Sequence, residues 1–217
     1  MNRKKRIVVL ISGSGSNLQA IMDACASEQI EGSVVGVISN KADAYGLTRA
    51  GNAGIETKTL SHKAFSSREE FDAQLAEEVD AFEPDYIVLA GFMRILTDQF
   101  VQRYLGKMVN IHPSLLPKYK GLHTHQRAID AGDSTHGASV HFVTPALDDG
   151  PVLVQGAVSI DADDDADSLQ HRVHKIEHII YPVAMQWLCS GKVKMANGRV
   201  YLNNELLPIE GKMYDVN

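Results

Sequence analysis

The chain has 217 residues, of which 44% are hydrophobic and 22% charged, and its formal net charge at pH 7 is -6. This length suits one large α/β domain, and the composition excludes a disordered or fibrous protein. The acidic balance argues against a general nucleic-acid-binding protein, which needs a basic surface to displace phosphate counterions. No stretch approaches the roughly 18 apolar residues of a membrane span.

Cysteine usage indicates the compartment. Cys25 and Cys189 are the two cysteines, and neither belongs to a CxxC pair. Two thiols without a disulfide framework are typical of proteins from reducing compartments. We therefore expect a cytoplasmic protein. The acidic charge and the lack of a membrane span predict neither nucleic acid nor a membrane as partner, and we expect a monomer or weak homodimer.

The first predicted elements form a strand, a glycine-rich turn and a helix. Residues 7–12 are a continuous apolar run that predicts a buried strand, and GSGSN at residues 13–17 precedes apolar residues at helical spacing. Free N–H groups at such a helix start bind anions. The alternative is that Ser16 or Asn17 only caps the helix. The turn lacks the third glycine of a dinucleotide fingerprint, which favours a single phosphate as its ligand.

Strands and helices then alternate as far as residue 90. We predict a strand at 34–39, a helix at 41–53, a strand at 55–60, a helix at 67–82 and a strand at 86–90. This order predicts a doubly wound, mostly parallel Rossmann-like sheet with helices on both faces. The segment GFMRIL at 91–96 follows the last of these strands, where ligands of such sheets bind. The alternative is that Met93, Ile95 and Leu96 form the core face of the next helix.

The segment VNIHPSLLP at 109–117 brings two polar side chains to one face of a strand. Asn110 and His112 lie two residues apart, and Pro113 ends the strand. An amide donor beside an imidazole that titrates near neutral pH suits the stabilisation of an oxyanion together with proton transfer. The alternative is a strand end at which both side chains only bind backbone groups.

The following segments predict a mobile loop at 118–125, a short helix at 126–131, and strands at 139–144 and 152–160. We interpret His123 and His125 as ordinary loop residues, because two histidines do not complete a metal site. Asp148 lies in the turn LDDGP between the two strands, where its carboxylate could orient and charge the His112 imidazole. Turn chemistry alone is the alternative reading of Asp148.

The last third of the chain predicts a long helix and a hairpin. Residues 162–166 form an acidic helix start without the pattern of a calcium loop, and the helix at 167–190 contains Glu177 among several histidines. Residues 192–202 with a central Asn-Gly pair predict a β-hairpin. We expect one domain over 1–217, with a phosphate-binding half at 1–100, a catalytic half at 101–190, and a hairpin and tail at 191–217.

The motifs GSGSN, FMRIL, NIHPSLLP, GLHTH and LDDGP occur in this order, and with them the sequence resembles the folate-dependent formyltransferases. The resemblance covers essentially the whole chain and is strongest to the branch that acts in purine synthesis. It implies that 10-formyltetrahydrofolate, as co-substrate, donates its formyl group to the amine of glycinamide ribonucleotide. It also implies that the catalytic half at 101–190 takes part in folate binding. It implies neither a metal nor a covalent intermediate.

The resemblance also implies roles for individual residues. It implies that the catalytic residues are Asn110, His112 and Asp148. The ribonucleotide is bound by Gly15, Ser16, Asn17 and Glu177. The folate is bound by Arg68, Met93, Arg94, Ile95, Leu96 and Asn110.

Two rival functions remain open at this point. One is a hydrolase that uses the same catalytic residues to activate water against formyltetrahydrofolate, and the other is a non-catalytic mononucleotide-binding protein. The substrate-side residues 15–17 and Glu177 speak against the hydrolase. The complete set Asn110, His112 and Asp148 speaks against the binding protein, which needs no proton shuttle.

Overall fold

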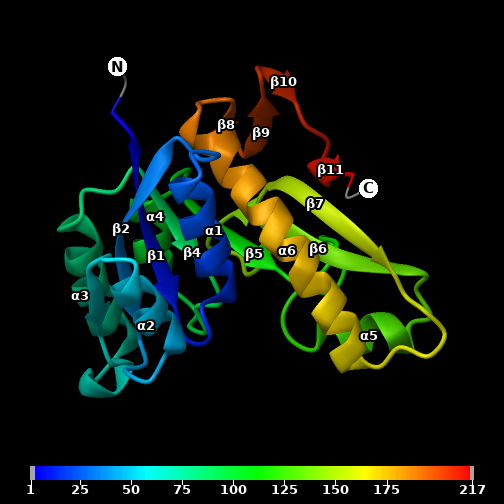
Figure 1. Cartoon of the computed structure of the whole chain (residues 1–217), viewed down its shortest axis with the longest axis horizontal. Helices are drawn as coiled ribbons and strands as arrows, with labels where there is room; N and C mark the ends of the chain where they lie inside the picture. Colours follow the sequence, from blue (N-terminus) through cyan, green and yellow to red (C-terminus); the bar gives the residue numbers. More distant parts are fainter. Residues whose placement is uncertain (1–2, 216–217) are drawn as a thin grey trace. The chain divides into compact units, whose positions relative to one another are not determined.

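The computed structural model describes residues 3–215 (Figure 1). The chain forms two compact units, divided in sequence between Asn110 and Ile111. No helix within the described residues is long and apolar enough to cross a membrane. The single-domain organisation stays a prediction.

The first unit is built on a parallel sheet with the strand order β3-β2-β1-β4-β5. Residues 7–11 of the central strand are fully buried, as expected of an apolar run that is covered on both faces. The strands are β1 (Lys5–Ile11), β2 (Gly32–Ser39), β3 (Thr57–Thr59), β4 (Tyr86–Leu89) and β5 (Met108–His112), the last of which crosses the division between the units.

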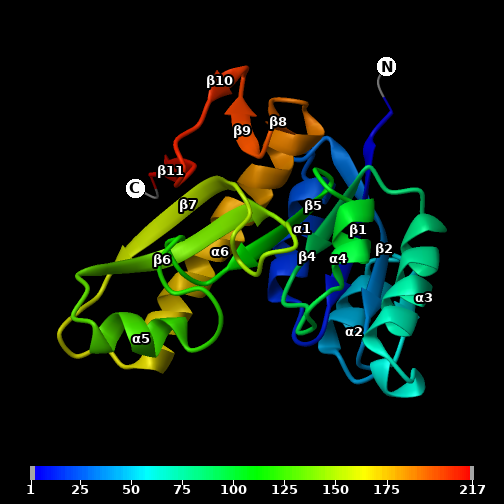
Figure 2. The same cartoon turned by 180° about the vertical axis from the view of Figure 1, so that it is seen from behind.

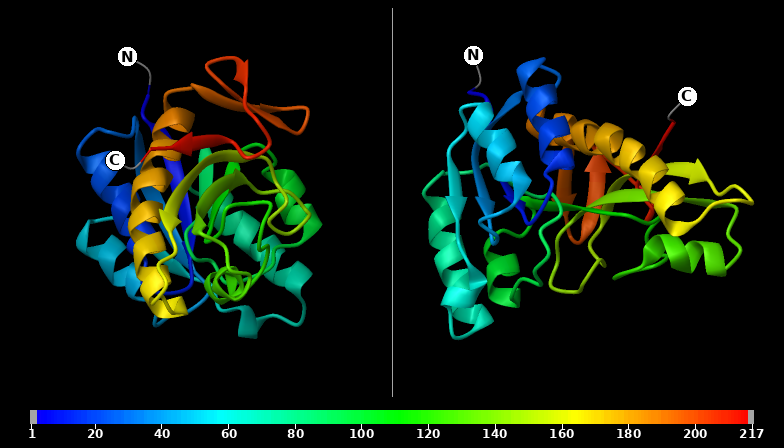
Figure 3. Two further views of the ribbon diagram at one scale, coloured as in Figure 1. Left: turned by 90° about the vertical axis from the view of Figure 1, so that its right-hand side faces the viewer. Right: turned by 60° about the horizontal axis from the view of Figure 1, so that its bottom comes forward.

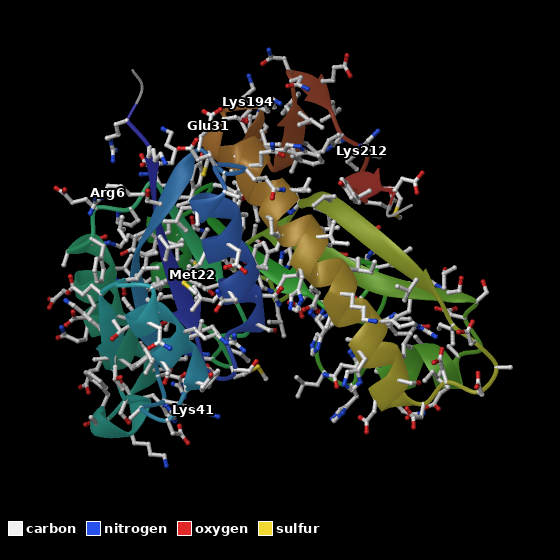
Figure 4. All side chains as sticks on the ribbon, in the orientation of Figure 1. Arg6, Met22, Glu31, Lys41, Lys194 and Lys212 are labelled. Atoms are coloured by element: carbon white, nitrogen blue, oxygen red, sulfur yellow. The ribbon has the colours of Figure 1, made fainter. Side chains whose placement is uncertain are left out.

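Helices cover both faces of this sheet. Figures 1 and 2, seen from opposite sides, show α1 and α2 over one face and α3 and α4 over the other. Met22, labelled in Figure 4, belongs to the buried side of α1. The predicted doubly wound α/β class is therefore confirmed. The helices are α1 (Ser16–Ala26), α2 (Tyr45–Asn52), the short η1 (His62–Ala64), α3 (Arg68–Asp80) and α4 (Asp98–Arg103).

The second unit pairs two long antiparallel strands and packs them against one long helix (Figure 3). Asp165 caps the start of this helix and forms a reciprocal capping box with Ser168. A third short strand pairs with β7 in parallel. The elements are α5 (Thr124–Asp130), β6 (Thr135–Phe142), β7 (Val152–Ser159), α6 (Ala166–Cys189) and β11 (Lys212–Tyr214).

The predicted C-terminal hairpin is confirmed as part of a small antiparallel sheet. Asn197 and Gly198 both have positive φ, 51° and 69°, as a tight hairpin turn requires. The sheet has the strand order β10-β9-β8 and consists of β8 (Val193–Ala196), β9 (Arg199–Leu202) and β10 (Glu205–Leu206).

Two predictions of local structure were wrong. The helix expected at 41–53 begins only at Tyr45, because residues 41–44 form a turn that is closed by a hydrogen bond from Ala44 to Lys41. The sequence did not predict β11, a strand of three residues whose pairing depends on β7, far away along the chain.

Candidate functional site

The glycine-rich turn after β1 leads into α1, and at Gly15 its backbone lies close to the backbone of Gly46. Gly15 is the N-cap residue of α1 with φ 71°, and no side chain caps this helix start. The alternative that Ser16 or Asn17 is the cap is therefore wrong. A Cβ atom on Gly15 would lie 2.6 Å from Cα of Gly46, so only glycine fits at this position. Main-chain N–H groups at an uncapped helix start are suited to bind an anion.

Arg49 on α2 adds positive charge beside this turn. Its Nε donates to the Ser14 carbonyl at 2.8 Å, its Nη1 donates to Gln19 Oε1 at 3.4 Å, and its guanidinium lies 4.9 Å from the Tyr45 ring centroid. A guanidinium held at this place favours an anionic ligand. The sequence analysis missed Arg49, although its spacing of three residues from Gly46 puts both on one helix face.

The predicted folate segment 91–96 is a loop, because α4 begins only at Asp98. The alternative that its apolar residues form the core face of a helix is wrong, since Met93 is 65% exposed and Ile95 60% exposed. Leu96 is half-buried, and Arg94 lies 5.2 Å from the ring centroid of Phe71. Exposed apolar side chains beside a guanidinium suit a flat aromatic ligand that also carries negative charge.

Two buried polar groups hold the ends of this loop. Ser12 Oγ accepts a hydrogen bond from the Met93 N–H at 2.8 Å and donates to Asn40 Oδ1 at 2.6 Å. The buried carboxylate of Asp72 accepts from the Thr97 N–H at 2.6 Å. The loop is therefore supported by the core of its own unit. Arg68 is the exposed first residue of α3.

The structure brings the predicted imidazole and carboxylate together. His112 is buried at the end of β5, and its Nδ1 lies 3.4 Å from Oδ2 of Asp148, whose side chain is 9% exposed. The His112 Nε2 lies 2.9 Å from the Tyr119 carbonyl, which only accepts hydrogen bonds. Both ring nitrogens thus lie near oxygen atoms that accept hydrogen bonds, and the charged form of the ring has an N–H donor for each of them. Asn110 is half-buried two residues earlier on β5.

A second buried histidine faces the other oxygen of this carboxylate. His141 on β6 lies with Nε2 3.9 Å from Asp148 Oδ1, and its Nδ1 donates to the Phe142 carbonyl at 2.9 Å. Burial lowers the pKa of His141 to about 4, although the bond to Phe142 and the charge of Asp148 act to raise it. His141 is therefore neutral near pH 7. The sequence analysis did not select it, because a histidine within an apolar strand carries no local functional pattern.

His125 and His136 form a contact of their own on α5 and β6. His136 Nε2 lies 3.1 Å from His125 Nδ1, and burial lowers the pKa of both rings, that of His125 to about 4. Within residues 3–215, no group of three histidine, cysteine or acidic side chains could hold a metal ion.

Glu177 lies on α6 and is only 4% exposed. Burial, together with the negative charge of Glu177, raises the pKa of Tyr181 one helical turn further on. A carboxylate so deeply buried is costly for the fold and marks a candidate functional position.

The fold is of the α/β class, and the buried contact of an imidazole with a carboxylate is of the kind that enzymes use for general acid–base chemistry. Comparison with known proteins identifies the family. Residues 5–185 match the family model for formyl transferases. The chain belongs to this family.

Similar proteins cover nearly the full chain. It is 54% identical to the phosphoribosylglycinamide formyltransferase of Escherichia coli, over 96% of this chain and 99% of that protein. The enzyme of the same name from Haemophilus influenzae is 46% identical over 95% and 98%. The solved structure of the phosphoribosylglycinamide formyltransferase from Coxiella burnetii has a TM-score of 0.93 at 48% identity, over 97% and 99% of the two chains.

Proposed function

We propose that the protein transfers the formyl group of 10-formyltetrahydrofolate to the amine of glycinamide ribonucleotide, giving formylglycinamide ribonucleotide and tetrahydrofolate in purine biosynthesis. Its similarity over nearly the full chain to enzymes named for this reaction supports the assignment. The observation that carries the chemistry is the buried contact between His112 and Asp148.

The proposed mechanism is a direct transfer through a tetrahedral intermediate. The amine nitrogen forms a bond to the formyl carbon, and the Asn110 amide and the charged His112 imidazole stabilise the oxyanion that develops on the formyl oxygen. The bond from that carbon to N10 of the folate then breaks. N10 gains the proton that the charged His112 holds, and His112 takes back one proton from the amine, so that the ring returns to its charged state.

Asp148 interacts with the positive charge that His112 carries in this scheme. Its carboxylate lies 3.4 Å from Nδ1 and fixes the plane of the ring. The Tyr119 carbonyl accepts from Nε2 in the resting enzyme. A substrate atom takes the place of this carbonyl when the proton is transferred.

The remaining site residues bind the two substrates in our proposal. Backbone N–H groups of the glycine-rich turn bind the ribonucleotide phosphate, and Arg49 adds to their positive potential. Glu177 contributes a buried carboxylate that contacts the ribonucleotide. The ribonucleotide residues are Gly15, Ser16, Asn17 and Glu177. The folate residues are Arg68, Met93, Arg94, Ile95, Leu96 and Asn110.

We further propose a cytoplasmic enzyme that acts on small molecules as a monomer or a weak homodimer, without a nucleic-acid or membrane partner. This proposal rests on the use of two cysteines without a CxxC pair, and Cys25 and Cys189 do not form a disulfide in the structure. Burial raises the pKa of Cys25 to about 11, which makes this thiol unreactive at neutral pH. Sedimentation across a range of protein concentrations tests the oligomeric state.

An absorbance assay with 10-formyl-5,8-dideazafolate, run with and without glycinamide ribonucleotide, tests the proposed reaction. We expect deformylation only when the ribonucleotide is present, with one formylated amine formed for each folate consumed. Deformylation without the ribonucleotide indicates the rival hydrolase. Absence of turnover in both cases contradicts the proposed function and leaves a binding protein.

A further inference from the structure

Lys120 and Asp149 are neighbours in sequence of Gly121 and Asp148, which are joined by a hydrogen bond. Lys120 precedes Gly121, whose N–H donates to Asp148 Oδ2 at 2.9 Å. Asp149 follows Asp148, and its carboxylate forms an ion pair with the Lys120 ammonium. Two consecutive residues of one segment thus bind two consecutive residues of the turn that carries Asp148.

The segment 119–121 contacts both members of the catalytic pair through its backbone. The Tyr119 carbonyl accepts from His112 Nε2, and the Gly121 N–H donates to Asp148. Gly121 has φ 80°, a left-handed conformation that aims its N–H at the carboxylate. The position of this segment therefore helps to decide how Asp148 is aimed at His112.

The backbone conformation of Asp148 and the hydrogen bonds of Arg127 show how the turn and the segment are held. Asp148 has φ 49°, an unfavourable conformation for a residue with a side chain. On the side of the segment, Arg127 donates through Nη1 to the carbonyls of Lys120 at 2.7 Å and Leu122 at 3.3 Å. These bonds order the segment. The ion pair between the side chains of Lys120 and Asp149, which we call the latch, connects the segment to the turn.

We propose that Lys120 and Asp149 are positioning residues of the formyl-transfer site: their ion pair holds residues 120 and 121 against the turn, so that the Gly121 N–H keeps the Asp148 carboxylate aimed at His112. This inference rests on the proposed function, whose catalytic pair it concerns. Neither residue touches reacting atoms. Both line a pocket of about 180 Å³ beside Asp148, and their side chains are 39% and 55% exposed, so salt weakens the latch.

The kinetic test compares Lys120→Ala with a matched control from the same loop. We expect Lys120→Ala to lower kcat roughly three- to fivefold, as the loss of a surface ion pair allows, and to change both KM values less than twofold. At about 1 M KCl the wild-type enzyme and the variant converge, because salt screens the latch. Lys118→Ala removes the exposed pair between Lys118 and Asp133, which does not contact the Asp148 turn, and leaves kcat unchanged.

Charge reversal separates positioning from a general loss of structure. Lys120→Asp and Asp149→Lys each lower kcat, and the double variant regains at least half of the wild-type kcat. Three outcomes overturn the proposal: wild-type kcat in Lys120→Ala, an equal loss in Lys118→Ala, or no recovery in the double variant.

Hydrogen exchange of the Gly121 amide, followed by NMR without substrate, tests the latch apart from the reaction. We expect exchange at least threefold faster in Lys120→Ala than in the wild type, and unchanged in Lys118→Ala. If the wild type does not formylate the ribonucleotide, the proposed function fails and this measurement still tests the latch. Unchanged exchange in Lys120→Ala contradicts the latch even in an active enzyme.

Discussion

The glycine-rich turn of the first unit and the His112–Asp148 pair of the second are built in opposite ways. The turn consists of consecutive residues, and it presents main-chain groups because Gly15 approaches Gly46 closely and no side chain caps α1. The pair is assembled from side chains of distant segments and is almost fully buried. If the proposed roles hold, phosphate binding and chemistry depend on different kinds of structure, and each should fail separately when it is altered.

Loss of the catalytic side chains should have the largest effect. We expect Asn110→Ala, His112→Ala and Asp148→Ala to lower kcat by ~10²–10⁴ while KM for the ribonucleotide changes little, because each removes a group that acts on the transition state. Steady-state kinetics measure the loss, and thermal unfolding checks that each variant folds. Near-wild-type turnover of purified, folded Asp148→Ala removes Asp148 from the mechanism.

Gly15→Ala should distort the glycine-rich turn and weaken binding of the ribonucleotide. A Cβ atom at this position meets Cα of Gly46 at 2.6 Å, and φ 71° is strained for alanine. We expect KM for the ribonucleotide to rise about tenfold and Tm to fall by several degrees, the strain being on the order of 1–2 kcal/mol. Gly13→Ala is the matched control, since no atom lies within 4 Å of its Cβ position. Equal effects of both variants contradict the role of the close approach.

The buried histidines of the second unit should make its stability depend on pH. The pKa of His125 and of His141 is lowered to about 4, and that of His136 is also lowered, chiefly by burial. Between about pH 6.5 and 4 the unfolded chain therefore binds protons that the folded chain does not. The free energy of unfolding falls as the pH drops through this window.

Urea denaturation at several pH values measures this loss. We expect a decrease on the order of 1–2 kcal/mol for each of the His125 and His141 rings between pH 7 and 5. His125→Asn should weaken the pH dependence, because it removes one ring from the contact between His125 and His136. A pH dependence that is unchanged in this variant contradicts the assignment of His125 as a neutral, buried ring.

Ser12→Ala should have the smallest effect of these changes. It removes the acceptor of the Met93 N–H and so loosens the predicted folate loop, while the glycine-rich turn keeps its backbone. We expect KM for the formylfolate to rise about threefold, more than KM for the ribonucleotide. Ser14→Ala is the control, because the structure records only the Ser14 backbone carbonyl in a hydrogen bond, with Arg49. A larger change in KM for the ribonucleotide contradicts this division of roles.

The same contrast explains what the sequence could predict. The strand at 7–12 and the glycine-rich turn follow from contiguous residues, and local patterns also predicted the hairpin at Asn197. Asp148 was found because a carboxylate follows a strand, which is a local feature as well. Its contact with His112 rested on the expectation that the ends of neighbouring strands lie together.

Contacts between distant residues could not be predicted in this way. His141 shares the carboxylate of Asp148, and Gly121 orients it, but both look ordinary in their own segments. Arg49 belongs to a helix whose start was misplaced by several residues, and its bond to Ser14 depends on the approach of α2 to the turn. Tertiary packing, which no local pattern records, decided each of these positions.

Calorimetric titration of glycinamide ribonucleotide into the wild type, Gly15→Ala and His112→Ala tests the central claim that binding and chemistry depend on separate structures. We predict that His112→Ala binds with the wild-type Kd although it has lost its turnover. Gly15→Ala should bind about tenfold more weakly, as a displaced main-chain anion site requires. Wild-type affinity in Gly15→Ala, or loss of binding in folded His112→Ala, contradicts the account.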